Sequence, residues 1–257
     1  MSSAPAFPPS AEPAAVRVEN LSKSFNDPKR GEVRAVDRVS FQVARGEIFG
    51  LLGPNGAGKT TTLRLISTLL KPTSGTALVG GCDIVAEPAK VRERIGFLAG
   101  ETGLYPRLTP REILKFFGEM HGMKGAPLAG RVQQMIARFG IEKFADTRTD
   151  KLSTGMKQRV AIARTMLHDP PVLILDEPTA GLDVPSARNI EQAVKEAKQA
   201  GKSIIYSTHF MEEAEFLCDR IAVISDGVVK ITGTMEDLRR ATGKQRLREI
   251  FVDLLGI

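Results

Sequence analysis

The sequence predicts an α/β protein in which a helical lobe is inserted into a core with a parallel sheet, and three observations predict it. An apolar run over 48–52 leads into a glycine-rich segment that opens a helix. Two further apolar runs, 172–175 and 203–207, are separated by a helical stretch over 186–199, which is the alternation of a parallel sheet. Between about 104 and 164, helical spacing dominates and strand signals vanish.

Composition indicates a globular protein with room for a proper core. Of the 257 residues, 42% are hydrophobic and 26% are charged, as in a soluble fold of one large domain or two modest ones. No window approaches the roughly 18 consecutive apolar residues that a membrane span needs, and the N-terminus lacks a leader pattern. Cys82 and Cys218 match no metal-ligand spacing. We therefore expect a cytoplasmic protein with two buried, reduced thiols.

An excess of basic residues raises the question of an acidic partner. The formal net charge is +6 at neutral pH. From Lys230 to the C-terminus, however, six basic residues stand against four acidic ones, so most of the excess is spread along the chain. No aromatic-rich strand is interleaved with basic residues, as it is in common RNA-binding modules. We expect a solvated basic surface and no nucleic-acid partner.

The N-terminal part is expected to hold a tail followed by two strands. Residues 1–14 carry four prolines among alanine and serine, with almost nothing to bury, and predict a disordered tail. Val16, Val18 and Leu21 alternate as they would in an edge strand, and 35–43 predicts a second strand.

The first helix is expected to run from about Lys59 to Leu70. The segment 71–75, Lys-Pro-Thr-Ser-Gly, ends it because proline cannot continue a helix and glycine permits a turn. Within the helical lobe, the segment 109–112, Thr-Pro-Arg-Glu, is a capping box with proline at the first helical position, so another helix begins there.

These signals divide the chain into three parts. A tail covers 1–14, the main domain covers 15–235 with the helical lobe at about 104–164 inserted, and a C-terminal extension covers 236–257. The extension is amphipathic and is more often a packing helix than a membrane anchor. Its apolar positions are Leu238, Leu247, Ile250, Phe251, Leu254 and Leu255.

The glycine-rich segment 53–60, GPNGAGKT, has the spacing of a phosphate-binding loop. Glycines let the backbone curl so that successive N–H groups and the positive helix end face one anion. Lys59 can then reach the β- and γ-phosphates of a nucleotide, and the Thr60 hydroxyl can coordinate a Mg²⁺ ion. The alternative is an ordinary glycine-rich turn, which the flanking strand and helix disfavour. The nucleotide-binding residues of the loop are then Gly53, Pro54, Asn55, Gly56, Ala57, Gly58, Lys59, Thr60 and Thr61.

Two adjacent carboxylates follow the apolar strand at 172–175. An open parallel sheet places its ligand crevice at this end, and burying Asp176 there without a partner is costly. We expect Asp176 to hold a Mg²⁺ ion jointly with Thr60, through water; the alternative is a helix cap or loop residue. Glu177 is the candidate general base for the water that attacks the γ-phosphate, and the alternative is a first-turn acid of the next helix.

His209 follows the next strand, in the segment 207–209, Ser-Thr-His. That strand ends at the same crevice, so we expect the His209 ring to contact the γ-phosphate, although a lone histidine is usually structural. His121 and His168 lack that context. The candidate catalytic residues are therefore Glu177, His209 and Lys59.

A second small-residue turn opens a helix at 152–158, Leu-Ser-Thr-Gly-Met-Lys-Gln, and is similar to another anion site. A nucleotide already held by the first loop does not require a second cradle in the same chain. This motivates the hypothesis that two chains pair and that each turn closes on the ATP of the other.

Five motifs stand in the order seen in ATP-binding-cassette (ABC) ATPases: the glycine loop, LSTGMKQR, LILDEP, AGLD at 180–183, and then His209. The chain resembles this family over 16–234. The resemblance implies a P-loop NTPase core with a parallel sheet, an antiparallel β subdomain at its edge and an inserted helical lobe. It also implies a head-to-tail dimer that sandwiches two ATP molecules between glycine loop and signature turn.

The same likeness assigns roles to residues outside the glycine loop. Phe25 matches the aromatic residue that stacks on adenine, and Asp183 would join the two halves. The residues that would touch the γ-phosphate of the opposite ATP are Ser153, Thr154 and Gly155.

Two departures from the family pattern stand out. The signature is commonly LSGGQ, whereas here Thr154 and Met156 replace a glycine and the glutamine; the Cβ of Thr154 narrows the backbone freedom, though its hydroxyl can donate to phosphate. The usual glutamine near the magnesium and the membrane partner falls at Gly100. Glu101 is a candidate substitute for it, but an extra carboxylate near the γ-phosphate repels unless a metal or proton intervenes. With the segment 101–112, ETGLYPRLTPRE, these variants look similar to the ATPases of sodium-exporting ABC systems; multidrug and polysaccharide exporter subunits are close relatives.

Three functions are compatible with these residues. The first is a cytoplasmic ATPase that uses ATP and Mg²⁺, works as a homodimer or a pair of ATPase subunits, and powers a separate membrane permease from the inner face of the cell membrane, as an exporter with sodium ions as a candidate substrate. The second is a soluble ABC-type ATPase acting on nucleic acid or ribosomes, which the basic charge favours and the single nucleotide-binding unit disfavours. The third is a regulatory module that closes on ATP without hydrolysing it, which the departure at Gly100 keeps open.

Overall fold

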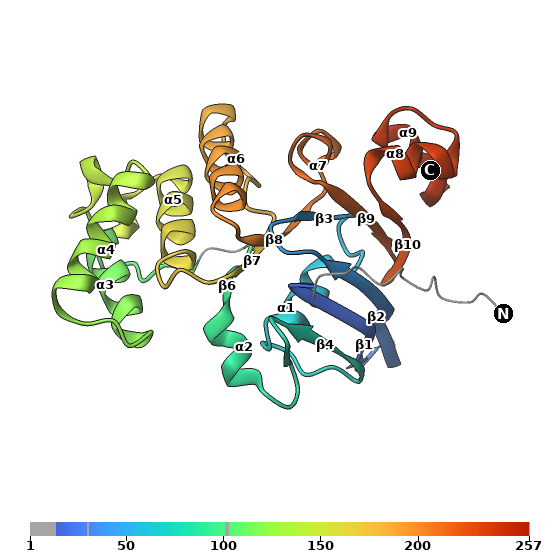
Figure 1. The fold of residues 1–257 in the computed structure, drawn as a ribbon, viewed down its shortest axis with the longest axis horizontal. Coiled ribbons are helices and arrows are strands. Elements are labelled where there is room, and N and C mark those ends of the chain that lie inside the picture. Colours follow the sequence, from blue (N-terminus) through green and yellow to red (C-terminus); the bar gives the residue numbers. More distant parts are fainter. Residues whose placement is uncertain (1–13, 30, 101–102, 257) are drawn as a thin grey trace.

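The structure is a computed structural model that describes residues 14–29, 31–100 and 103–256. Figure 1 shows a sheet-containing core with a group of helices at one side and the C-terminal helices at the other. The expected tail, apart from Ala14, and the expectation for Glu101 lie outside the described residues.

The larger sheet is mostly parallel and has the strand order β10-β9-β3-β8-β7-β6 in the described part of the chain. Its strands are β3 (Ile48–Leu52), β6 (Ile95–Leu98), β7 (Val172–Asp176), β8 (Ser203–Thr208), β9 (Arg220–Ser225) and β10 (Val228–Gly233). Every residue of β3, β7 and β8 is buried. Because both faces of a parallel sheet are covered, these strands appear in the sequence as continuous apolar runs. The predicted parallel sheet is therefore confirmed, and β10 runs antiparallel to its neighbour β9.

The smaller sheet is antiparallel and corrects one expectation. It has the order β2-β1-β4-β5, with β1 (Val16–Asp27), β2 (Gly31–Val43), β4 (Ser74–Val79) and β5 (Cys82–Asp83). The interpretation of the Val16 segment as an edge strand is wrong, because β1 pairs with β2 on one side and β4 on the other. Alternation reports that one face of a strand is buried, and it carries no information about the two hydrogen-bonding edges.

Helices α3 (Pro110–Met120), α4 (Gly125–Arg138) and α5 (Thr154–Thr165) form the helical lobe, and Figure 1 shows them grouped beside the sheet. The predicted capping box is present: Thr109 Oγ1 accepts from the Glu112 N–H, and the Glu112 carboxylate accepts from the Thr109 N–H. Three further helices lie between strands of the core in the chain. Helix α1 (Lys59–Ile66) follows β3, α2 (Pro88–Arg94) precedes β6, and the longer α6 (Val184–Gln199) lies between β7 and β8.

The first helix is shorter than predicted. It ends at Ile66, not Leu70, because Thr68 adopts a left-handed backbone with φ of 63°. The N–H groups of Leu69 and Leu70 then both donate to the Arg64 carbonyl, which closes the helix end. The segment 71–75 does not remain a turn throughout, since Ser74 already begins β4.

The C-terminal extension forms two helices, α8 (Met235–Thr242) and α9 (Leu247–Leu255), after α7 (Met211–Leu217). Gly243 separates them in a left-handed conformation, with φ of 71°. Leu238, Leu247 and Ile250 are fully buried and share an apolar cluster with β9 and α7 residues. The extension therefore packs on the core, as expected. Among the residues that the structure describes, none of the helices is both long and apolar enough to cross a membrane.

The two cysteines are free, as expected, but they differ in burial. Cys82 is buried, whereas Cys218 is partly buried. A Cβ on Gly50 would lie 2.8 Å from the Cys218 sulfur, so the thiol is packed against β3. Burial, more than the nearby acidic groups, raises the pKa of Cys218. This thiol therefore stays protonated and behaves as a packing side chain.

His121 and His168 form a stacked pair between the end of α3 and the segment after α5. Their ring centres are 3.7 Å apart and their planes differ by 3°. The His168 Nε2 atom lies 3.0 Å from the Ile95 carbonyl oxygen. Burial, followed by the neighbouring His121, lowers the pKa of His168 to about 4. The ring is therefore neutral at pH 7 and fulfils a structural role.

Lowering the pH from 7 to 5 is expected to reduce the free energy of unfolding by about 2 kcal/mol through His168. The unfolded chain takes up the proton near the ordinary histidine pKa of about 6.5, whereas the folded chain takes it up only at about pH 4. Stability is thus lost as the pH falls through this window. Urea unfolding of the wild type and His168→Gln at both pH values measures the effect. Equal losses in the two proteins would contradict it.

Candidate functional site

The strand order brings three loops to one edge of the larger sheet. β8 lies between β3 and β7 and is parallel to both, with Leu52 opposite Thr208 and Asp176 opposite Ser207. The carboxyl ends of these strands therefore meet at the same edge, where open parallel sheets bind ligands. The glycine loop follows β3, Glu177 follows β7, and His209 follows β8.

The glycine loop curls as the spacing predicts. Gly56 and Gly58 have φ values of 81° and 99°, and a Cβ on Gly58 would lie 2.5 Å from the Ala35 carbonyl oxygen. Gly58 is also the N-cap of α1, which has no side-chain cap and no acidic residue in its first turn. The first N–H groups of the helix are therefore left for an external anion.

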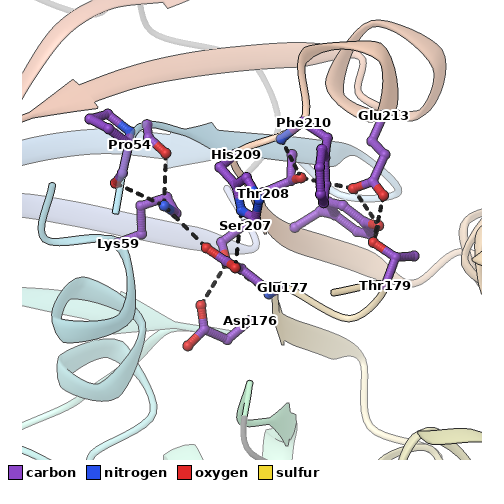
Figure 2. Close-up of polar contacts among 12 residues, drawn as sticks. Pro54, Lys59, Asp176, Glu177, Thr179, Ser207, Thr208, His209, Phe210 and Glu213 are labelled. Atoms are coloured by element: carbon purple, nitrogen blue, oxygen red, sulfur yellow. Dashed lines mark hydrogen bonds and ion pairs between the residues drawn. The ribbon is translucent and has the colours of Figure 1, made fainter. Parts of the chain in front are cut away.

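Lys59 is 4% exposed, and its ammonium group lies among three oxygen atoms. It donates to the carbonyl oxygens of Gly53 at 2.8 Å and Pro54 at 3.1 Å, and it lies 3.2 Å from Glu177 Oε1 (Figure 2). The long side chain thus crosses from the glycine loop to the end of β7. A phosphate placed here would meet a buried positive charge that is already oriented.

Glu177 joins the other two loops. Its Oε1 atom faces Lys59, and its Oε2 atom lies 3.1 Å from His209 Nδ1 (Figure 2). The structure therefore brings together the three candidate catalytic residues at one point. Glu177 also has a left-handed backbone, with φ of 45°, a conformation that costs about 1 kcal/mol outside glycine. Its N–H donates to Ser207, to the carbonyl at 3.2 Å and the hydroxyl at 3.0 Å.

Asp176 is 2% exposed and faces a different partner from Glu177. Its Oδ1 atom accepts a 2.6 Å hydrogen bond from the Ser207 hydroxyl. Ser207 thus connects both carboxylate residues, since its Oγ also accepts from the Glu177 N–H. Ser207 was not among the site residues predicted from the sequence. The sequence does contain a signal for Ser207: two apolar segments that are expected to pair in parallel end in Asp-Glu-Pro and in Ser-Thr-His, so their polar ends lie at the same edge of the sheet.

The residues present fit a Mg²⁺ ion held mainly by phosphates and water. Among the described residues, no group of three or more histidine, cysteine and acidic side chains could hold a metal ion. Mg²⁺ commonly uses only one or two protein carboxylates and substrate phosphates. Next to Asp176 the chain carries Gly100, where a Cβ would lie 3.9 Å from Asp176 Oδ2. This second oxygen thus faces space that a longer side chain at position 100 would enter.

The second small-residue turn, at 152–158, is the signature turn of the family pattern, and it lies against the start of α6. Ser153 caps α5 by accepting from the Met156 N–H at 3.3 Å, and Asp183 caps α6 by accepting from the Ser186 N–H at 2.8 Å. A hydrogen bond with the Ser186 side chain, followed by the one from the Ser186 N–H, lowers the pKa of Asp183. A Cβ on Gly155 would lie 2.9 Å from Ser186 Oγ. The turn and Asp183 are therefore neighbours within one chain.

Thr154 and Gln158 add two findings about α5. Thr154 is the first residue of the helix and is not among the residues with positive φ, so the Cβ that replaces the usual glycine causes no backbone strain. Gln158, which sequence reasoning did not single out, is 5% exposed and donates from Nε2 to the Pro178 carbonyl at 2.6 Å. The helix is thereby tied to the residue after Glu177.

Two groups of predicted site residues are not brought to the catalytic cluster. The first group is Ser153, Thr154 and Gly155, at the start of α5. Figure 1 shows α5 beside α3, α4 and α6, separated from α1 by β6 and β7. Phe25, in β1, is 41% exposed, and the Lys23 ammonium lies 5.3 Å from its ring centre. An exposed aromatic ring on a β1 residue is free to accept a flat partner.

A phosphate-binding loop between β3 and α1, a buried carboxylate at the end of β7 in the same parallel sheet and an inserted helical lobe define a P-loop nucleotide-binding protein. Residues 36–180 match the family model described as ABC transporter. The chain therefore belongs to the ABC transporter family. It is the ATP-binding subunit, an ATPase that hydrolyses ATP for transport.

Known proteins of this family are similar over most of the chain. The ABC transporter ATP-binding protein NatA of Bacillus subtilis is 41% identical over 93% of this chain and 98% of its own length. A solved ATP-binding subunit of an ABC transporter superposes with a TM-score of 0.85 at 32% identity, over 94% of this chain and 99% of that one. A dimeric ATP-binding cassette bound to ADP and phosphate gives 0.78 at 30% identity, over 85% and 98%. The ABC ATPase fold is thus confirmed.

Proposed function

We propose that this chain powers a separate membrane permease as the ATPase of an exporter, held at the inner face of the cell membrane by that permease. The observation that carries the proposal is the cluster in which Glu177 contacts both Lys59, at 3.2 Å, and His209, at 3.1 Å. The family supplies the link to transport. Sodium export is supported by the departures from the family pattern at the signature turn and at Gly100, which together with the segment 101–112 resemble sodium-exporting systems.

In this proposal the residues at the sheet edge divide the work of phosphoryl transfer. Lys59 and the loop 53–61 hold the polyphosphate, the loop through N–H groups other than those of Pro54, which has none, and Ala57, which donates to the Pro54 carbonyl. Glu177 accepts the proton of the attacking water. His209 contacts the γ-phosphate and keeps Glu177 oriented through its Nδ1 atom. Thr60 and Asp176 would hold a Mg²⁺ ion, which offsets negative charge on the phosphates when bound.

Phosphate oxygens of ATP compete with the contacts that Lys59 makes in the structure. The ammonium has three donors, and its neighbours are the Gly53 and Pro54 carbonyls and Glu177. A bound γ-phosphate draws one of these donors away from Glu177. The carboxylate is then released from its cation and is free to accept a hydrogen bond from water, which links nucleotide binding to the position of the attacking water.

Two chains are proposed to pair head to tail, so that each signature turn completes the other chain's site. The separation of α5 from α1 in Figure 1 supports this arrangement, and a similar cassette has been solved as a dimer. Ser153, Thr154 and Gly155 would then contact the γ-phosphate of the partner's ATP, and Asp183 would lie at the junction. Phe25 would stack on the adenine of the same chain's nucleotide.

Glu177→Gln is expected to lower Mg²⁺-dependent ATP turnover by on the order of a hundredfold or more while ATP binding persists, because the amide cannot accept the proton. Phosphate release and nucleotide affinity are measured on the same samples. Glu93→Gln, at an exposed acid on α2, is the matched control and should keep wild-type turnover. Unchanged turnover in Glu177→Gln would remove the residue from its proposed role.

Mixing two inactive variants is expected to restore ATPase activity if the sites are shared. Lys59→Ala removes the buried ammonium but keeps the signature turn, whereas Ser153→Asp keeps a good helix cap and places a negative charge beside the expected γ-phosphate. A mixed dimer has one intact composite site. Ser153→Asn, which caps without charge, is the control and should remain active. Failure of the mixture to exceed the sum of the separate rates would argue against shared sites.

Reconstitution with the membrane protein encoded beside this chain is expected to give ATP-dependent sodium movement across vesicles. Sodium flux is followed with ATP on the side of the ATPase, and Glu177→Gln serves as the inactive control. ATP-dependent movement of another substrate would support the transport function and exclude sodium as the substrate. Tight, steeply salt-dependent binding to RNA or DNA without any membrane partner would instead favour the alternative function on nucleic acid.

A further inference from the structure

Three hydroxyl groups converge on one carboxylate beside the catalytic cluster. Glu213, on α7, accepts from Thr179 Oγ1 at 2.5 Å through Oε1, and from Thr208 Oγ1 at 2.8 Å and Tyr206 OH at 3.3 Å through Oε2 (Figure 2). Thr179, Tyr206 and Thr208 are at most 5% exposed. A carboxylate satisfies several donors at once because it only accepts hydrogen bonds. The network therefore depends on the Glu213 side chain as the common acceptor of three hydroxyl groups.

The hydroxyl groups belong to the two segments that carry Glu177 and His209. Thr179 lies two residues after Glu177, and Thr208 is the residue immediately before His209. The Thr208 hydroxyl also accepts from the Phe210 N–H at 2.9 Å. Thr208 and Phe210, the residues on either side of His209, are therefore joined by a hydrogen bond. The Thr208 hydroxyl in turn donates to Glu213. One carboxylate thus sets the spacing between the loop after β7 and the loop after β8.

Tyr206 contributes a fixed donor to this network. Burial, followed by the charge of Glu213, raises the pKa of Tyr206, so the phenol stays protonated. The Tyr206 hydroxyl oxygen lies 3.4 Å from Thr179 Oγ1, so the network also joins β8 directly to the loop after β7. A buried network with all its donors satisfied holds its members in one arrangement.

We propose that Glu213 is a positioning residue for ATP hydrolysis, which holds the Glu177 and His209 loops at the spacing that keeps the Glu177 carboxylate on the His209 ring. The inference rests on the roles proposed above for these two residues. Glu213 itself contacts neither of them and acts through Thr179 and Thr208. Its effect is therefore expected in the rate of the chemical step and not in the binding of ATP.

Glu213→Gln is the first test, because the amide has nearly the same shape but can satisfy fewer hydroxyl donors. We expect kcat to fall about tenfold with the KM for ATP changed by less than about twofold. Glu212→Gln is the matched control, since Glu212 is exposed on the same helix, and it should match the wild type. Turnover is measured well below the unfolding midpoint of each variant. Wild-type kcat in Glu213→Gln, or a loss confined to KM, would overturn the proposal.

The second test separates positioning from general loss of stability. In a Glu177→Gln background, Glu213→Gln is expected to lower the residual turnover by less than about twofold, because the carboxylate that it positions is already absent. A further tenfold fall would show that Glu213 acts independently of Glu177 and would overturn the inference. If Glu177→Gln alone left turnover unchanged, the proposed role of Glu177 would fail instead, whatever the outcome at Glu213.

Discussion

The parallel pairing of β8 with both β3 and β7 is the constraint on which the rest of the site depends. It places Leu52 opposite Thr208 and Asp176 opposite Ser207, so three loops that are distant in the sequence start from the same edge. A shift of this register by one residue would turn Asp176 and Ser207 to opposite faces of the sheet. The buried apolar side chains of the three strands prevent that shift, and the polar chemistry therefore relies on hydrophobic packing.

Charge balance within the site follows from this placement. Lys59 and Asp176 are both almost fully buried, and a buried charge requires compensation. Lys59 is compensated by two carbonyl groups and Glu177, whereas Asp176 has the Ser207 hydroxyl on one oxygen. Among the residues that the structure describes, Asp176 has fewer compensating partners than Lys59. This difference between Lys59 and Asp176 fits a site in which a Mg²⁺ ion, bound together with the polyphosphate, would supply the positive charge that Asp176 lacks.

Sequence reasoning predicted the parts of the fold that repeat a local pattern. The apolar strands, the glycine loop and the capping box at Thr109 each depend on a few neighbouring residues, and the structure shows all three. The placement of Lys59, Glu177 and His209 at one crevice also followed, because parallel strands end at a common edge, whereas their direct contacts were not predicted. The role of each residue in hydrolysis remains a proposal.

Features that depend on distant neighbours were not predictable. The place of β1 inside its sheet is set by pairing with β2 and β4, which alternation cannot report. The end of α1 depends on the single left-handed residue Thr68. Glu213 looked like an ordinary helix acid in the sequence, and only the tertiary structure places three hydroxyl donors around its carboxylate.

The bond from Gln158 to the Pro178 carbonyl has a mechanical consequence. Gln158 belongs to the helical lobe, and Pro178 directly follows the proposed general base. Any rotation of the lobe relative to the core must either stretch this bond or drag the backbone beside Glu177 with it. This one bond therefore joins the orientation of the lobe to the backbone beside Glu177.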